Sequence, residues 1–178
     1  MDNLILGLLI LHPRTIYQLR KRIEEGMQLM YSCSTGSIQA AIKKLLKNGD
    51  ISIEETIENG RRKKIYCITN KGRETFQQWV DETFITEAPK NAELAKIYFM
   101  GFSDENHREE RVKKHMRELQ GIFAKLDKIC QNGNEMMKDE PKNDILFFQL
   151  QTAKFGRDLM EFQIQWYRQF LKEMRKRK

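Results

Sequence analysis

The interval at which apolar residues recur changes twice along this chain, and these changes limit the folds open to it. Ile51, Ile53 and Ile57 alternate with mostly polar residues, as in a strand with one buried face. Asn59-Gly60 favours a type I′ turn, and residues 61–68 form a return strand. Before and after this stretch the apolar residues recur at helical spacing. The sequence therefore predicts a β-hairpin inserted between helices.

Three helices are predicted ahead of the hairpin, at residues 4–11, 16–25 and 34–48. The first is apolar on almost every side, so we expect it at the centre of a core. Thr15 and Gln18 form a capping-box pattern at the start of the second helix. The third has an apolar stripe on one face and polar or basic residues on the other, which suits a helix whose outer side stays open.

A fourth helix is predicted after the hairpin, with Thr69 as its N-cap. Four large apolar residues follow at helical spacing: Phe76, Trp79, Val80 and Phe84. Three helices, a hairpin and a closing helix make a winged helix-turn-helix, a DNA-binding architecture in which residues 34–48 are the recognition helix. We expect this DNA-binding domain to span residues 1–86.

The second half of the chain, residues 87–178, shows helical periodicity only. We expect a short helix at 92–102 and then a long helix that ends at a break at residues 132–134. The long helix repeats its apolar residues at alternating intervals of three and four, the heptad pattern of coiled coils. A last helix begins near Asp144. The predicted fold class is mainly α with a small β-hairpin wing, in which a winged helix-turn-helix precedes a coiled-coil-like dimerisation domain.

The last predicted helix carries two apolar stripes on different faces. A single long neighbour within the chain cannot cover both, so we expect a second copy of the chain and hence a homodimer. Which stripe faces the partner is left open. The predicted dimerisation residues come from both long helices: Leu119, Phe123, Leu126, Phe155, Leu159, Phe162 and Trp166.

The composition favours a polyanionic partner. Lys and Arg outnumber Asp and Glu by 32 to 25, and the resulting net charge of +7 suits nucleic acid or an anionic membrane surface. Solubility alone explains such an excess equally well. No apolar run approaches the roughly 18 residues of a membrane-spanning helix, and no secretory signal is recognisable, so we expect a cytoplasmic protein without membrane contact. Three cysteines without a C-x-x-C pair predict reduced thiols.

The start of the predicted recognition helix supplies the candidate base contacts, because this end of the helix enters the major groove. Gln39 is the candidate for direct readout, since its amide can bond bidentately to adenine; an exposed side chain without a ligand is the alternative. The hydroxyl groups here fit helix caps at least as well as phosphate ligands. The candidate DNA-binding residues of this helix are Ser34, Thr35, Gly36, Ser37, Gln39, Lys43 and Lys44.

The predicted wing supplies the candidate phosphate contacts. Its basic run directly follows the turn, so some of its side chains project from the hairpin tip towards a phosphate backbone or a minor groove. The alternative is a solvated edge strand whose charges block aggregation. The candidate residues are Asn59, Gly60, Arg61, Arg62 and Lys63, and Lys64 continues the run.

No catalytic or metal-binding constellation is recognisable, so we expect a protein that is not an enzyme and has no cofactor. The three histidines, His12, His107 and His115, lack the spacing of a metal-ligand pair. The sequence has no phosphate-binding loop, dinucleotide fingerprint or nucleophile elbow.

Nearly the whole chain resembles the PadR family of transcriptional regulators. Residues 4–11 and Thr15–Leu19 look like the family's opening helix and its tyrosine-containing second helix, and residues 34–45 are similar to its recognition-helix motif. Gly60–Thr69, which looks like the family's basic wing, is part of the most specific match. The chain departs from the family at Gln39-Ala40, where a Tyr-Pro pair is usual, so no operator sequence can be carried over. The second half resembles the longer dimerisation module of one subfamily.

The resemblance implies a homodimeric repressor that binds a near-palindromic operator in double-stranded DNA and that a small molecule can release. It suggests that the hydroxyl of Tyr17 contacts a phosphate, although a half-buried core tyrosine fits equally well. Some relatives hold a flat aromatic effector in the dimer interface, so a planar aromatic ligand near Trp166 is an alternative to plain core packing. A winged module that binds proteins instead of DNA is the rival interpretation.

Overall fold

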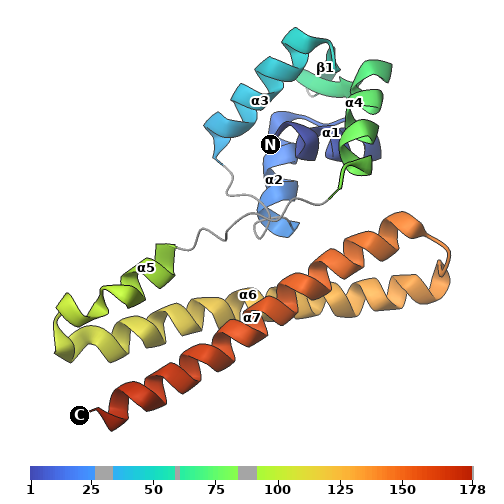
Figure 1. Ribbon diagram of the computed structural model, residues 1–178. Coiled ribbons are helices and arrows are strands. Elements are labelled where there is room, and N and C mark those ends of the chain that lie inside the picture. Colours follow the sequence, from blue (N-terminus) through green and yellow to red (C-terminus); the bar gives the residue numbers. More distant parts are fainter. Residues whose placement is uncertain (27–33, 59–60, 84–91, 178) are drawn as a thin grey trace. The chain divides into compact units, whose positions relative to one another are not determined.

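The computed structural model describes residues 1–26, 34–58, 61–83 and 92–177, which belong to two compact units, Met1–Glu87 and Ala88–Lys178 (Figure 1). Within the described ranges, the first unit consists of helices and a two-stranded antiparallel sheet, and the second of helices alone. The predicted fold class is confirmed. None of the helices in these ranges is both long and apolar enough to cross a membrane.

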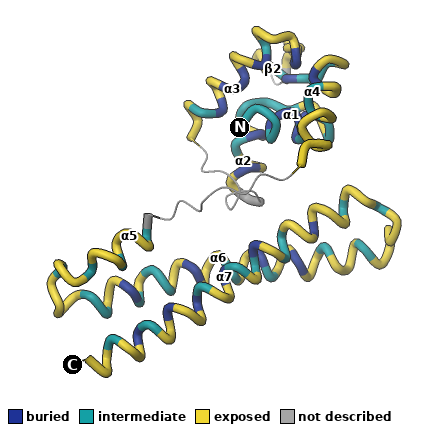
Figure 2. The backbone as a smooth tube through the Cα atoms, in the orientation of Figure 1, coloured by how far each residue is buried: buried dark blue, intermediate teal, exposed yellow. Residues whose placement is uncertain are grey.

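Helix α1 (Asp2–Leu11) lies at the centre of the core of the first unit. Its buried residues are spread around the helix: Ile5, Leu6, Leu8 and Leu9. The helix ends where His12 becomes extended, with φ of −161°, because the residue before a proline disfavours helical geometry. An almost wholly apolar helix is therefore enclosed by its neighbours, as its sequence predicts (Figure 2).

Helices α2 (Ile16–Gly26) and α3 (Thr35–Asn48) form the helix-turn-helix. The predicted capping box of α2 is present: Gln18 N–H donates to Thr15 Oγ1 at 3.2 Å, and Thr15 N–H donates to Gln18 Oε1 at 2.9 Å. Helix α3 ends at Gly49, whose φ of 75° suits glycine. The apolar stripe of α3 lies in the core: Ile38, Ala41, Ile42 and Leu45 are buried.

Strands β1 (Ile51–Glu58) and β2 (Arg61–Ile68) form the wing. The register pairs Ile51 with Ile68 at the base and Glu58 with Arg61 at the far end, which leaves a two-residue connection. The predicted turn residues Asn59 and Gly60 lie outside the described residues. The strand assignment and the register agree with a tight hairpin.

The wing is longer than the core that it covers. Ile51 and Tyr66 are buried at its base, whereas Ile57 is 75% exposed. The alternating isoleucines indicate the inner face of β1 correctly but not how far the core extends beneath it. The base is also held by a bridge that the sequence does not reveal: Arg14 N–H donates to the Tyr66 carbonyl at 3.1 Å, and Tyr66 N–H donates to the Arg14 carbonyl at 2.9 Å.

Helix α4 (Asn70–Asp81) closes the first unit. The predicted N-cap is present, because the hydroxyl of Thr69 accepts the N–H of Gly72 at 3.1 Å. Of the four apolar residues expected on its inner face, Phe76 packs against the core, whereas Trp79 and Val80 are exposed and Phe84 lies outside the described residues. The helix therefore covers the core through a narrower stripe than its sequence predicts.

Asp50 ties α3, the wing and α4 together. It is 3% exposed, and its N–H donates to the Leu45 carbonyl at 2.9 Å. Its carbonyl accepts the N–H of Thr69 at 3.0 Å, and its carboxylate accepts the hydroxyl of Thr75 at 3.2 Å. Buried backbone and carboxylate groups are costly unless they are paired, so these bonds fix the geometry of the junction.

Replacing Gly72 with alanine should destabilise the winged unit by about 3 kcal/mol, a loss typical of severe overpacking. An added Cβ would lie 2.0 Å from the carbonyl oxygen of Asp50, a backbone atom that cannot move without breaking the junction. Chemical denaturation of the full chain measures the change. Gly36→Ala is the matched control, because Gly36 also lies in the first turn of a helix and an added Cβ would meet only Ser34 Oγ at 3.9 Å. Equal stability of the two variants would contradict the prediction.

The second unit begins with a short helix in two pieces, α5 (Ala92–Tyr98) and the 3₁₀ turn η1 (Met100–Phe102). The single helix predicted at 92–102 is therefore wrong in its last turn. The long helices α6 (Glu105–Asp139) and α7 (Asp144–Lys176) follow, capped by the side chains of Asp104 and Asn143.

Helix α6 continues through Asn132-Gly133-Asn134, so the predicted break is wrong. The glycine serves helix packing instead, since an added Cβ at Gly133 would lie 2.8 Å from Leu150 Cδ1 of α7. Three poor helix formers in a row suggest a loop by propensity alone, but the contact with α7 overrides a weak local preference. The connection lies after Asp139.

The two long helices pack side by side as an antiparallel pair (Figure 1). Two ion pairs bridge them near the surface, Asp127 with Arg157 at 3.9 Å and Glu109 with Arg175 at 3.0 Å. The predicted heptad stripe of α6 faces α7, and the buried residues of the joint core are Val112, Leu119, Leu126, Met160, Ile164, Tyr167 and Leu171. One of the two apolar stripes of α7 is therefore covered within the chain.

Candidate DNA interface and dimerisation face

The outer face of α3 carries exposed polar and basic side chains. Gln39 and Lys43 are exposed, and Lys47 lies one helical turn further along the same face. Because the opposite face is anchored in the core, the helix holds these side chains in a fixed direction. The arrangement can present an amide and two ammonium groups to a groove of DNA.

Two of the candidate hydroxyl groups at the start of α3 are occupied by capping bonds. Ser37 N–H donates to Ser34 Oγ at 3.1 Å, and Ser34 N–H donates to Ser37 Oγ at 3.2 Å. The hydroxyl of Ser37 also donates to the Ser34 carbonyl at 2.8 Å. Thr35 and Gly36 are exposed beside this box. The capping role inferred for the two serines is therefore observed, and Thr35 is the hydroxyl that remains open for a phosphate.

Lys44 is directed away from the other candidates by an ion pair. Its Nζ lies 2.6 Å from Asp2 Oδ2 of α1, and this hydrogen bond and charge raise the pKa of Lys44. The lysine keeps its charge, but the carboxylate beside it offsets part of its electrostatic effect on a phosphate. The two residues are 42 positions apart in the sequence, so no local pattern predicts this ion pair.

Tyr17 lies on α2 with 66% of its surface exposed. A core role is therefore wrong for this tyrosine, and its hydroxyl is open to solvent. It follows the capping box at Thr15 in the first turn of the helix that precedes the recognition helix. Such a position suits a contact to the DNA backbone.

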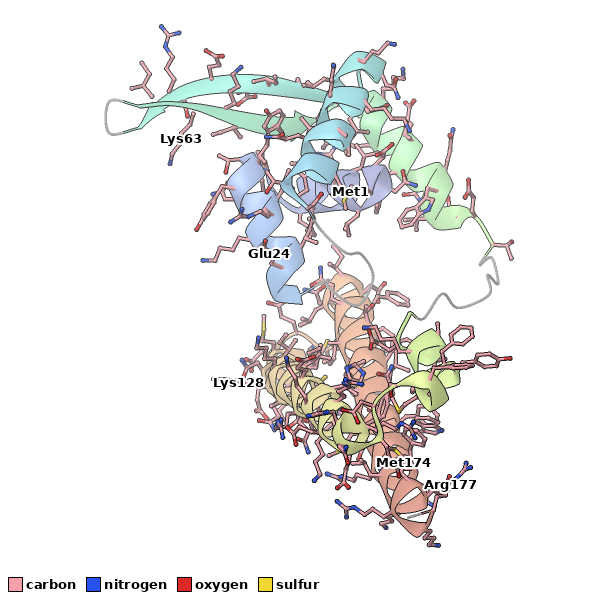
Figure 3. The ribbon with its side chains drawn as sticks, turned by 90° about the vertical axis from the view of Figure 1, so that its left-hand side faces the viewer. Met1, Glu24, Lys63, Lys128, Met174 and Arg177 are labelled. Atoms are coloured by element: carbon pink, nitrogen blue, oxygen red, sulfur yellow. The ribbon has the colours of Figure 1, made fainter. Side chains whose placement is uncertain are left out.

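The wing presents cations on both faces of its outer half. Arg62 and Lys63 are exposed, and Figure 3 shows Lys63 on the part of the hairpin that extends beyond the helices. Arg61 belongs to β2, but its side chain, like Asn59 and Gly60, lies outside what the structure describes. Neighbouring residues on one strand point to opposite faces, so Arg62 and Lys63 diverge.

The antiparallel register sets acidic residues opposite the basic run, which the sequence analysis missed. Glu55 pairs with Lys64 across the strands, and their charged groups are 3.9 Å apart. In the backbone register Glu58 lies opposite Arg61. These glutamates precede residues 59–60 by the same number of positions as the basic residues follow them. A hairpin that turns at residues 59–60 therefore predicts the pairing from the sequence. The wing is therefore less basic than Arg61–Lys64 alone suggests.

The predicted dimerisation residues fall into two groups. Leu119 and Leu126 are buried between α6 and α7 of one chain, and Phe123 packs partly against the same core. They have little surface left for a second chain. The other group lies on the uncovered stripe of α7: Phe155 and Phe162 are 71% and 62% exposed, Trp166 is 40% exposed, and Leu159 is half-buried.

A second exposed apolar stripe lies on α6 and was missed from the sequence. Ile122, Ile129 and Met136 are exposed and recur at intervals of seven residues, so they share one face of the helix. The Asp127–Arg157 pair puts Ile129 level with Phe155 on the neighbouring helix. The seven-residue repeat was available as a signal, but the stronger heptad of the buried stripe masked it.

The chain was compared with known proteins. Residues 5–78 match the transcriptional regulator PadR-like family. The negative transcriptional regulator PadR of Bacillus subtilis (strain 168) is 26% identical over 131 residues, which cover 68% of this chain and 72% of that protein.

Two crystal structures of Bacillus subtilis PadR share the fold. The complex with operator DNA has 19% sequence identity and a TM-score of 0.79, covering 97% of this chain and 96% of that chain. The complex with p-coumaric acid has 17% identity and a TM-score of 0.68, covering 97% of both chains. The PadR-like family consists of transcriptional regulators and not of enzymes. Residues 5–78 are therefore similar to the PadR-like family of transcriptional regulators, and the chain as a whole shares the fold of these structures.

Proposed function

We propose that the protein is a homodimeric repressor in which each winged unit binds one half of a near-palindromic operator. The observation that carries this proposal is the open polar face of α3 beside a wing that extends beyond the core. In helix-turn-helix proteins the corresponding helix enters the major groove and the dimer binds half-sites about one helical turn apart, roughly 34 Å. A cytoplasmic location is part of this proposal, because it suits a protein whose target is DNA.

Base recognition is assigned to the first two turns of α3. Gln39 is exposed, and its amide can donate to and accept from adenine in the major groove at the same time. Lys43 follows one turn later and can reach guanine or a phosphate. The N–H groups at the start of the helix add a partial positive charge that favours a phosphate near Thr35.

Phosphate binding is assigned to the wing and to Tyr17. Arg61, Arg62 and Lys63 follow the turn, and the described members of this run are exposed. Asn59 and Gly60 would bring the backbone of the turn close to the DNA. Contacts of this kind fix the register of the protein on the duplex, whereas base contacts supply the sequence preference.

Dimerisation is assigned to the uncovered stripes of the second unit. Phe155, Phe162 and Trp166 leave a large apolar surface in water on α7, and Ile122 and Ile129 do the same on α6. Exposed apolar patches of this extent mark interaction sites. Repeats of seven residues suit a coiled-coil-like contact with a second copy, which would present the same stripes by symmetry.

Repression and release are assigned by analogy with the relatives. The Bacillus subtilis protein is a negative regulator, and one of its structures contains p-coumaric acid. A planar aromatic compound would release the operator in this protein if it binds the DNA-free state more tightly than the DNA-bound state.

The wing provides the decisive experiment. Operators are first selected from a random duplex pool, and Arg61→Ala/Arg62→Ala is then compared with wild type on the selected sequence. We expect about a 10- to 100-fold loss of affinity, because each lost phosphate contact removes a charge-assisted bond, with no change in dimer mass. Lys125→Ala/Lys128→Ala is the matched control, since it removes two exposed cations of α6.

A protein-binding wing is the second candidate, and the glutamates of β1 favour it. Glu54 and Glu55 are exposed on the strand that faces the basic run, so the wing could hold a partner of mixed charge. Unchanged DNA retention in the wing variant, together with loss of a protein contact, would establish this function and sink the DNA-binding one.

A further inference from the structure

An open cavity lies between α6 and α7 in the second unit. Its volume is about 290 Å³, close to the lower end of the range of small-molecule sites. Phe123 of α6 and Ile164 of α7 supply its apolar lining, and both pack in the joint core of the two helices. The apolar part of the wall is therefore held in place before any ligand binds.

Four exposed polar side chains complete the lining of the cavity: Gln120, Glu161, Gln165 and Arg168. The last three share one face of α7, because they follow one another at intervals of four and three residues. Gln120 joins them from α6. The lining thus offers one anionic group, one cationic group and two amides, each of which can donate and accept hydrogen bonds.

The two charged groups of the cavity do not neutralise each other. Glu161 and Arg168 are seven positions apart, which is about 10.5 Å along the helix axis. Neither side chain forms an ion pair or a hydrogen bond within the described ranges of the chain. Both charges therefore stay available to a ligand.

A matched pair on α6 shows that this separation can be bridged directly. Glu110 and Arg117 have the same order and the same spacing of seven residues, and their charged groups lie 2.7 Å apart. Neither of them lines the cavity. A glutamate and an arginine at this spacing can therefore reach each other, whereas on α7 the same two side chains border the cavity without meeting.

We propose that this cavity binds a small zwitterion with an apolar body, of the kind that an aliphatic amino acid represents. The Arg168 guanidinium pairs with the carboxylate of the ligand, and the Glu161 carboxylate pairs with its ammonium group. The two amides can bond to either group, and the apolar lining accepts the body of the ligand.

Ligands that carry a single kind of charge fit the cavity less well. A dianion would meet the Glu161 carboxylate, a diamine would meet the Arg168 guanidinium, and like charges at short range repel. A ligand with one charge leaves one of the two side chains without a partner, and an uncharged ligand leaves both. A zwitterion pairs with both at once.

The cavity lies outside the proposed dimerisation face. On α6, Gln120 and Ile122 are on opposite sides of the buried stripe, since successive residues are rotated by about 100° around the helix axis. On α7, none of the exposed apolar residues assigned to dimerisation lines the cavity. The proposal therefore goes beyond the proposed function and requires neither DNA binding nor a dimer.

An NMR titration of the full chain with L-leucine, in the absence of DNA, tests the site. Ligand is added up to about 10 mM, which is enough to observe a millimolar dissociation constant. Two ligands of similar shape each lack one charge: leucinamide has no carboxylate, and 4-methylpentanoate has no ammonium group. We expect leucine to bind about five times more tightly than either, the upper end for an ion pair that solvent still reaches.

Two variants assign the charges separately. Arg168→Gln should abolish the difference in affinity between leucine and leucinamide, and Glu161→Gln should abolish the difference between leucine and 4-methylpentanoate. Arg117→Gln and Glu110→Gln are the matched controls, since they remove the same charges from the directly paired residues on α6. Both controls should keep the wild-type preference for leucine.

Two results would overturn the proposal. One is a leucine affinity that does not exceed the affinities of both analogues, including no detectable binding of leucine. The other is the full wild-type preference in Arg168→Gln or in Glu161→Gln. Because no DNA is present, a failure of operator binding would leave this test unaffected.

Discussion

Raising the salt concentration from 50 to 200 mM should weaken operator binding by about 10³- to 10⁵-fold, the loss expected for roughly six to ten phosphate contacts. Lys43, Lys47, Arg62 and Lys63 are exposed on α3 and the wing, so a dimer offers about eight such cations. Each phosphate that a cation neutralises releases condensed counterions, and added salt opposes that release. Fluorescence anisotropy with a labelled operator at a series of salt concentrations measures the slope.

The same titration can be made residue-specific. Lys43→Gln should lower the slope of log affinity against log salt by about two per dimer, since each half-site loses one phosphate contact. Lys125→Gln, on α6, should leave the slope unchanged. A salt profile that is flat for the wild-type protein would contradict DNA binding through these surfaces.

Replacing Phe155 and Phe162 together by aspartate should convert the proposed dimer to a monomer and lower operator affinity by more than about 100-fold. The two phenylalanines are exposed in the single chain, so the fold of one chain does not depend on them. In a dimer the carboxylates would be buried without partners, which is strongly unfavourable. A monomer also loses the high effective concentration that links the two half-sites, a factor of about 10² to 10⁴.

Sedimentation velocity gives the mass, and the anisotropy assay gives the affinity. Gln165→Asp/Lys172→Asp is the matched control, because both residues are exposed on α7 and are seven positions apart, like the phenylalanines. It should leave the mass of the dimer unchanged. If the phenylalanine variant stays dimeric, the contact between chains lies on another surface.

The elements of this chain could be predicted because helix and strand periods, caps and turns are local. Thr15 and Thr69 cap the helices that they were expected to cap. The errors arose where a distant segment decides the outcome. Residues 132–134 look like a loop by composition, and only the approach of Leu150 shows why a helix needs glycine there.

The sequence predicted which side chains of the candidate site are exposed, but not which partners they contact. The exposed face of α3 follows from the apolar stripe opposite it, so Gln39 and Lys43 were placed correctly on the outside. The ion pair of Lys44 with Asp2 joins residues 42 positions apart, and no local pattern encodes it.

The junction at Asp50 has a consequence for how such a regulator can adapt. Its bonds to Leu45, Thr69 and Thr75 join the end of the recognition helix, the base of the wing and the closing helix. If α3 and the wing contact DNA as proposed, the distance between these two contacts is set within one winged unit and does not change with the length of the operator. In the proposed dimer, any tolerance for operators of different spacing would therefore have to come from segments outside the winged units.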